Sequence, residues 1–265
     1  MTVTLRLETP ADHYAVEAMT RDAFWRFWEP DREICEEHLL THRLRAAGGF
    51  VPELNYVALA DGELAGHIIY SKSRIERDNG EALETLTFGP LTVRPDMQRK
   101  GIGKALMRRT FDEAKRLGYP GVIIFGHPDY YPRVGFRRAS EFGITTSDGK
   151  SFDALMAYPL CDGALDGAAG KYYIDPVYDT LNQADALAFD QKFPPKARID
   201  AVLIGVLLER LGADAAKAIE SLGFQTLELM RSKSRREILA LPGMDEISVG
   251  TVSAVMAEHG WVWGR

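Results

Sequence analysis

Alternating apolar and polar positions predict an opening strand, a helix and a β-hairpin. Residues 2–7 alternate in this way, and TPAD at 9–12 is typical of a helix start with proline in the first turn. The strand-like runs 54–60 and 63–71 are separated by Asp-Gly at 61–62, a pair that tolerates the positive φ angles of a type I′ turn. We therefore expect two antiparallel strands joined by a tight turn.

A strand, a helix and a second strand are predicted in the middle of the chain. Residues 84–93 (ETLTFGPLTV) have strand character, but we expect a splay or bulge at Gly-Pro 89–90, because proline removes a ladder donor and glycine permits a bend. Apolar residues recur at helical spacing over 101–117, and Gly118 is the expected stop. The β-branched run 121–125 predicts a strand buried on both faces, and hence a parallel crossover.

The pattern becomes purely helical beyond residue 200. Residues 152–160 supply the last strand-like run, and the CDGALDGAAG that follows is either a linker or a turn and short helix on the first domain. Helices are expected at 200–211, 213–222, 226–230, 234–241 and 248–259. We predict an α/β domain at 1–160, a linker or tail packed on it at 161–196, and a small all-α domain at 197–265.

The composition indicates a soluble globular protein and disfavours several other classes. With 265 residues, 46% apolar and 26% charged, the chain is typical of a soluble globular protein, and its net charge of −6 disfavours nucleic acid and anionic lipid on average. Only Cys35 and Cys161 occur, without CxxC spacing, so no disulfide framework or zinc site is expected. We find no signal peptide and no apolar run of the roughly 18 residues that cross a bilayer, and we expect a cytoplasmic protein without membrane contact.

A glycine-bearing loop between a strand and a helix holds the candidate chemistry. VRPDMQRKGIGKA (93–105) places free backbone N–H groups and the positive end of a helix dipole where phosphate oxygens can bind. A Walker A loop would need glycine where Gln98 stands and Ser or Thr where Ala105 stands. A dinucleotide fingerprint would need glycine in place of Leu106. We expect an anion here, but neither of these two motifs.

The same loop resembles the Q/R-x-x-G-x-G/A signature of the GCN5-related N-acetyltransferase (GNAT) family, matched by QRKGIG at 98–103. A second segment, YPRVGF at 131–136, is similar to the family's Y-x-x-x-G-F ending. The resemblance covers about residues 1–160 and is closest to the YhbS-like subgroup of predicted acetyltransferases. It implies a GNAT-type splayed sheet with flanking helices, and an enzyme that transfers acetyl from acetyl-CoA to a primary amine by direct attack in a ternary complex.

The resemblance also assigns site residues. It implies that backbone amides and cationic side chains clasp the pyrophosphate of acetyl-CoA, and that Tyr131 protonates the leaving thiolate. The expected cofactor contacts are Leu91, Thr92, Val93, Gln98, Arg99, Lys100, Gly101, Gly103 and Lys104. The family's asparagine ahead of the tyrosine is replaced here by the short His-Pro-Asp at 127–129, so cofactor contacts from asparagine are not expected.

Acetylation of an amine requires a base for the amine, a hydrogen-bond donor to the oxyanion and an acid for the leaving thiolate. A primary amine with a pKa near ~10 is only about one part in a thousand neutral at pH 7, so a base or a water chain must take its proton. Glu84, near the start of the central strand, is the candidate base, with a solvated edge carboxylate as the alternative. Backbone N–H groups at 91–93 are candidate donors to the oxyanion. For Tyr131 the alternative to acid catalysis is simple packing beside Phe136.

Acceptor-lining candidates are His127, Trp25 and Trp28, for which ordinary structural packing is the competing interpretation. The acceptor itself, a small molecule or a peptide amine, is not identified. Three other histidines lack partners at metal-ligand spacing, and no metal is expected: His38, His42 and His67.

The C-terminal segments GFQTLELM (223–230), ILALPG (238–243) and ISVGTV (247–252) resemble a helix-hairpin-helix domain, such as the C-terminal domain of the bacterial RNA polymerase α subunit. Such hairpins bind DNA phosphates through glycine amides and nearby cations, here Arg231, Lys233, Arg235 and Arg236. Asp245 and Glu246 oppose this, and 8 basic against 9 acidic residues over 197–265 give −1. We favour packing or protein contact.

Two other functional classes stay open beside the enzyme. One is a non-catalytic acetyl-CoA sensor or scaffold, and the other is a DNA-associated regulator that acts through the helical domain. A homodimer is also compatible with the sequence.

Overall fold

The computed structural model describes residues 1–25, 32–128, 130–197, 202–224 and 226–259, with Trp261 and Trp263, and without the side chains of Glu228 and Ser232. The chain forms two compact units, one of residues 1–24 and 35–194 and the other of residues 25–34 and 195–265. None of the helices in these ranges has the length and apolar character that crossing a bilayer requires.

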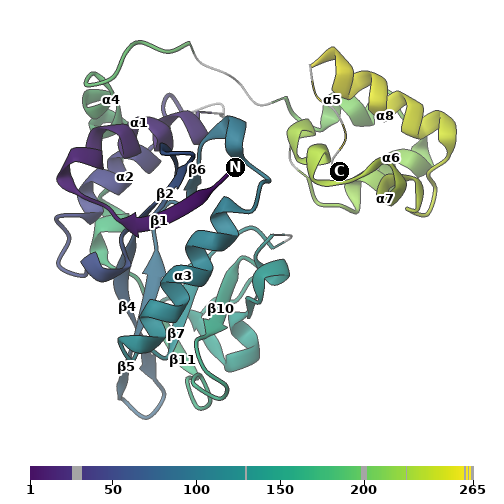
Figure 1. Ribbon diagram of the computed structural model, residues 1–265. Helices are drawn as coiled ribbons and strands as arrows, with labels where there is room; N and C mark the ends of the chain where they lie inside the picture. The colour runs from purple at the N-terminus through teal and green to yellow at the C-terminus, as the bar shows by residue number, and fades with distance from the viewer. Residues whose placement is uncertain are drawn as a thin grey trace. The chain divides into compact units, whose positions relative to one another are not determined.

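The first sheet of the first unit is antiparallel and contains the predicted hairpin (Figure 1). Its strands lie in the order β1 (Val3–Leu7), β2 (Tyr56–Ala60), β3 (Glu63–Ile68) and β6 (Thr92–Val93). Asp61 and Gly62 between β2 and β3 have φ angles of 49° and 91°, the positive values that a type I′ turn needs. The predicted hairpin is therefore confirmed.

Helices cover both faces of this sheet. On one face, the hydroxyl of Thr20 on α1 (His13–Ala23) lies 3.0 Å from that of Thr92 on β6, and α2 (Glu37–Leu44) packs on α1. On the other face, a Cβ on Gly66 would lie 2.9 Å from Ile102 on α3 (Ile102–Arg116). The first helix and the helix at 101–117 were predicted from the sequence, whereas α2 was not.

The second sheet has seven strands, in the order β8, β10, β7, β5, β4, β11, β9. Their bounds are β4 Tyr70–Arg77, β5 Ala82–Phe88, β7 Gly121–Phe125, β8 Arg137–Arg138, β9 Ile144–Thr146, β10 Leu155–Pro159 and β11 Gly170–Tyr173. Strands β5 and β7 run parallel, with Leu86 opposite Val122, and α3 lies between β6 and β7 along the chain. The predicted parallel crossover is confirmed.

The predicted interruption of the central strand is a β-bulge. β5 pairs with β4 as far as Phe88 opposite Tyr70, and β6 pairs with β3 from Thr92 opposite His67. Three residues, 89–91, therefore lie opposite only two on the neighbouring strand. The extra residue breaks the ladder and turns the strand from the second sheet into the first.

Residues 161–194 continue the first unit. β11 pairs with β4 and with β9, and its Tyr172 is buried. After it, α4 (Gln183–Asp190) packs on α2. β11 was not predicted from the sequence, because this short strand depends on the unpaired backbone groups that the edge of β4 offers.

The second unit is helical over most of its described residues. Its helices are α5 (Gly205–Leu208), α6 (Ala213–Glu220), α7 (Arg235–Leu239) and α8 (Glu246–Glu258). They enclose a core that includes Leu207, Ile219, Leu227, Ile238 and Val252. The segment expected as a helix at 226–230 forms a 3-10 helix, Leu227–Ser232, and the one expected at 200–211 is reduced to α5 in its described part.

Candidate active site

The bulge exposes two backbone N–H groups of the β6 segment. The N–H of Arg94 donates to the carbonyl of Ala65 on β3 at 2.9 Å. Successive N–H groups of an antiparallel strand point to opposite sides, so that of Thr92 also faces β3, whereas those of Leu91 and Val93 face away. β6 is the edge strand of its sheet. Of these predicted contacts, Leu91 and Val93 can donate to a ligand at the open edge, and Thr92 cannot.

The loop before α3 presents further unpaired N–H groups. Arg99 and Gly101 have φ angles of 65° and 85°, and the left-handed residue Gly101 precedes the helix. No hydrogen bond from a backbone N–H of residues 98–104 to any described residue is present. The first turn of α3 adds the positive end of its dipole. Together these groups form a cradle for an anion.

The side chains of this loop divide into two groups. Arg99 and Lys104 form no ion pair with any residue that the structure describes, so both are available to a ligand. By contrast, the Gln98 amide donates to a backbone carbonyl of β6 at 3.3 Å, and the Lys100 ammonium donates to the carbonyl of Asp96 at 3.0 Å. Gln98 and Lys100 therefore shape the loop in this structure, and the backbone together with Arg99 and Lys104 faces outward.

Tyr131 lies next to the bulge. Its ring centroid is 5.9 Å from that of Phe88, the last residue of β5, and 5.3 Å from that of Phe136. A Cβ on Gly126 would lie 2.4 Å from the Tyr131 ring, so the ring can approach the end of β7 only because residue 126 is glycine. Burial raises the pKa of the Tyr131 hydroxyl above its ordinary value. The structure thus places the Tyr131 ring against Phe88, the residue that directly precedes the bulge.

Tyr130 belongs to the same site, although the sequence analysis gave it no role. Its hydroxyl lies 3.5 Å from the position that a Cβ on Gly103 would take, in the first turn of α3. The Leu91 and Val93 side chains approach the same point to 3.6 Å. The tyrosine doublet at 130–131 was the available signal, but the motif assigns a role only to its second member.

Glu84 lies away from this site. It is on β5, four residues before Phe88, which corresponds to about 13 Å along a strand. Its side chain is 56% exposed and forms an ion pair of 3.2 Å with Lys72. The expectation that Glu84 acts as the base is not supported by this placement, because a strand position near the sequence motif does not put the carboxylate near the bulge.

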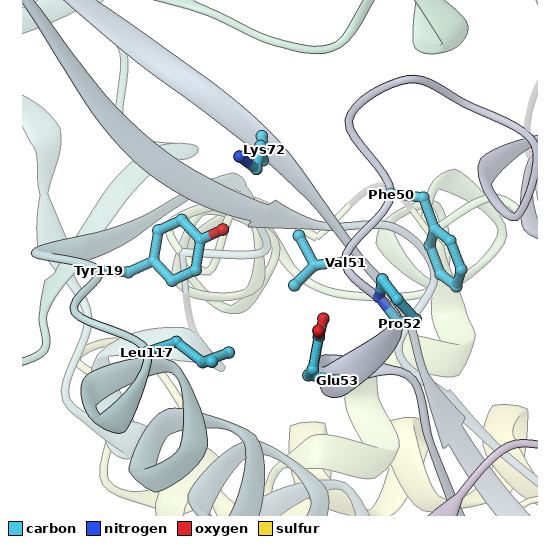
Figure 2. Close-up of a pocket in the computed structure, with 7 residues that line it drawn as sticks. All are labelled: Phe50, Val51, Pro52, Glu53, Lys72, Leu117 and Tyr119. Atoms are coloured by element: carbon cyan, nitrogen blue, oxygen red, sulfur yellow. The ribbon is translucent and has the colours of Figure 1, made fainter.

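A cavity of about 360 Å³ lies on the Glu84 side, at the carboxyl end of α3. It is lined by Phe50, Val51, Pro52, Glu53, Lys72, Leu117 and Tyr119. Figure 2 shows the Glu53 carboxylate and the Tyr119 hydroxyl directed toward the same space. Because α3 has 15 residues, this cavity is roughly 22 Å from the anion cradle along the helix axis.

The three residues predicted to line the acceptor site are His127, Trp25 and Trp28. His127 is exposed two residues beyond β7, and its carbonyl accepts from the N–H of Tyr130 at 3.0 Å. Trp25 is 5% exposed, and its indole N–H donates to the carbonyl of Ala197 at 2.7 Å within the second unit, which agrees with the packing alternative. Trp28 lies outside the described residues.

The three histidines without metal-ligand spacing divide between the interior and the surface, and the His42 side chain is 49% exposed. His38 and His67 are fully buried, and His42 pairs with Glu17 at 2.9 Å. Among the residues with described positions, no group of three or more His, Cys, Asp or Glu side chains is arranged to hold a metal ion.

Comparison with known proteins agrees with this geometry. Residues 18–136 match the model of the acetyltransferase (GNAT) family. The uncharacterized N-acetyltransferase YhbS of Escherichia coli (strain K12) is 29% identical over 167 residues, which make up 63% of this chain and 92% of that protein.

Two solved structures share the fold. The structure of YhbS from Escherichia coli in complex with CoA has a TM-score of 0.58 at 25% identity and covers 68% of this chain and 93% of that one. A GNAT family acetyltransferase from Brucella melitensis in complex with acetyl-CoA has a TM-score of 0.52 at 24% identity, with coverage of 67% and 99%. The segment that matches the GNAT acetyltransferase family contains the bulge, the glycine loop and both tyrosines.

Proposed function

We propose that the first unit transfers the acetyl group of acetyl-CoA to a primary amine. The observation that carries this proposal is the convergence of three elements: the anion cradle before α3, the outward N–H groups of Leu91 and Val93, and the Tyr131 ring beside the bulge. The related protein solved with CoA, and the fold relative solved with acetyl-CoA, support the choice of donor.

Each group has a defined part in the reaction. Arg99, Lys104 and the loop amides hold the diphosphate, which fixes the position of the thioester. The amine nitrogen attacks the thioester carbon, and the N–H groups of Leu91 and Val93 donate to the oxygen on which negative charge develops. The carbon–sulfur bond then breaks, and Tyr131 gives its proton to the sulfur and regains one from solvent. The proton of the amine leaves to water, since Glu84 lies away from this point.

The experiment that tests this function compares wild type with Tyr131→Phe. A screen of amino acids, polyamines, aminoglycosides and peptide N-termini first identifies an acceptor by thiol release from acetyl-CoA. Removal of a general acid then lowers kcat by about 10²-fold or more, and leaves the Kd for CoA unchanged.

A sensor or scaffold gives a different result. Such a protein binds CoA, releases no thiol with any amine of the screen, and is unaffected by Tyr131→Phe. Tyr14→Phe on α1 is the matched control, because Tyr14 is exposed and stacks on Phe193 rather than at the bulge. Failure of the wild-type protein to bind CoA would contradict the enzyme and the sensor alike.

For the second unit we propose a packing or protein-contact role. The hairpin between α7 and α8 uses its polar groups internally: Arg235 forms an ion pair with Glu246, and the Asp245 carboxylate caps α8 by accepting from the N–H of Ser248 at 2.7 Å. A Cβ on Gly243 would lie 2.8 Å from the carbonyl of Asp214, so this glycine packs against α6. The ion pair occupies Arg235, one of the cations with which a helix-hairpin-helix module would bind phosphates.

A further inference from the structure

The Tyr130 hydroxyl lies across from the start of α3. It is 3.5 Å from the point where Gly103 would carry a Cβ, and that point is also 3.6 Å from the side chains of Leu91 and Val93. Because residue 103 is glycine, the Tyr130 hydroxyl can lie close to the backbone of the first turn of α3. The Tyr130 hydroxyl is therefore a neighbour of the first turn of α3.

The position of Tyr130 is fixed by its neighbours. Its ring packs edge-on against that of Tyr131, with the centroids 5.0 Å apart and the planes at 79°. Its N–H donates to the carbonyl of His127 at 3.0 Å, and its carbonyl accepts from the N–H of Arg133 at 3.1 Å. The ring plane differs from that of Tyr131, so the two phenols of the doublet can serve different atoms of one ligand.

Tyr130 is 41% exposed, so its hydroxyl is accessible to a ligand. This hydroxyl makes no hydrogen bond to any residue in the described part of the chain, and burial raises the pKa of the phenol above its ordinary value. At neutral pH it is therefore a neutral donor, as hydrogen bonding to an anion requires. The N–H groups of the neighbouring loop before α3 likewise have no hydrogen-bond partner among the residues whose positions are described.

We propose that Tyr130 is the second wall of the diphosphate site and donates a hydrogen bond from its hydroxyl to a phosphate oxygen that the α3 loop holds from the other side. The inference rests on the proposed function, since it takes the ligand to be coenzyme A. The two adjacent tyrosines then have different roles: Tyr130 positions the diphosphate, and Tyr131 donates a proton to the sulfur. Tyr130 is thus a binding and positioning residue rather than the acid.

The test uses the full chain, CoA and the variant Tyr130→Phe, which keeps the ring and removes only the hydroxyl. Loss of one hydrogen bond to a charged group weakens CoA binding about tenfold in calorimetry. Tyr14→Phe is the control and should leave the Kd unchanged. Thermal unfolding without ligand should be the same for Tyr130→Phe and wild type, which would show that the fold is intact.

A second readout separates a direct contact from a general effect on the site. The ³¹P resonances of bound CoA report the diphosphate and the 3′-phosphate separately. We expect Tyr130→Phe to shift the diphosphate resonances and to leave the 3′-phosphate resonance in place. Unchanged affinity, or diphosphate resonances identical to those of the wild-type complex, would overturn the role of Tyr130 while leaving the proposed function intact. If the wild-type protein binds no CoA, the proposed function itself fails, and this inference fails with it.

Discussion

A Cβ added to Gly89 would lie 2.4 Å from the Cδ1 atom of Leu44, so α2 packs directly on the bulge. Leu44 is fully buried, so the side chain would have to repack within the interior to admit this Cβ. Gly89→Ala should therefore lower the free energy of unfolding by about 1–3 kcal/mol through overpacking. Because the same residue sets the direction of the amides that follow, CoA affinity should fall as well.

Urea unfolding and calorimetry with CoA measure these two effects. Gly48→Ala is the matched control, because a Cβ there meets no atom within 4 Å. Equal stability of Gly89→Ala and Gly48→Ala would show that the contact with Leu44 does not constrain the bulge.

The burial of Tyr131 predicts how activity depends on pH. Its pKa is raised by burial, with a smaller contribution from Tyr130, so the acid stays protonated above the ordinary tyrosine value of about 10. We expect no loss of kcat from this group between pH 7 and 10, measured as thiol release corrected for uncatalysed thioester hydrolysis. A descending limb with a midpoint below 10, present in wild type and absent from Tyr131→Phe, would contradict the assignment.

Two buried histidines should make the first unit less stable in mild acid. Burial lowers the pKa of His38 and His67 to about 4, although carboxylates of Asp190 and Glu8 lie 3.3 and 3.5 Å from their rings. The unfolded chain takes up these protons below about pH 6.5, so stability falls as the pH is lowered from 6.5 toward 4. Each histidine contributes at most about 1.4 kcal/mol per pH unit.

Urea unfolding at a series of pH values tests this dependence. His67→Gln should reduce the slope between pH 6.5 and 5, because one of the two proton-binding groups is removed. A wild-type free energy of unfolding that stays constant over this range would show that these histidines are not held neutral in the folded state.

Arg45 joins two carboxylates in the interior of the first unit. Its guanidinium lies 2.6 Å from Glu8 and 2.5 Å from Glu17, and the Glu8 side chain has no exposed surface. Arg45→Met leaves these carboxylates without their cation, which should cost about 3–5 kcal/mol of unfolding free energy. Arg138→Met removes the exposed ion pair with Asp153 and should change stability little. Urea unfolding measures both variants, and an equal loss of unfolding free energy in the two would show that burial of the Arg45 ion pairs does not increase their contribution to stability.

The second unit should not retain DNA. Arg235 is already paired with Glu246, and the carboxylates of Asp245 and Glu246 stand at the start of α8. We expect no mobility shift of duplex DNA at low salt with the full chain. A salt-dependent shift that is abolished by replacing Arg235 and Arg236 with alanine would instead favour the regulator.

Local chemistry explains which elements were predicted correctly. The hairpin at Asp61-Gly62 and the break at 89–90 depend on residue types that act within a few positions, and the helix at 101–117 depends on an amphipathic pattern of 15 or more residues. α2 and β11 were missed because each is short. Their stability comes from burial against partners distant in sequence, such as α1 for α2 and β4 for β11.

Some features of the candidate site could likewise be located from the sequence, whereas others could not. The order of residues along the chain was enough to locate the anion loop and Tyr131, because the unpaired N–H groups of a helix start and the motif around the tyrosine are properties of contiguous segments. Which amides of 91–93 face the ligand, the distance of Glu84 from the bulge and the approach of Tyr130 to Gly103 were decided only by the tertiary structure. These three features depend on strand register and on contacts between segments that are distant in the sequence. No short stretch of residues encodes the register or such contacts.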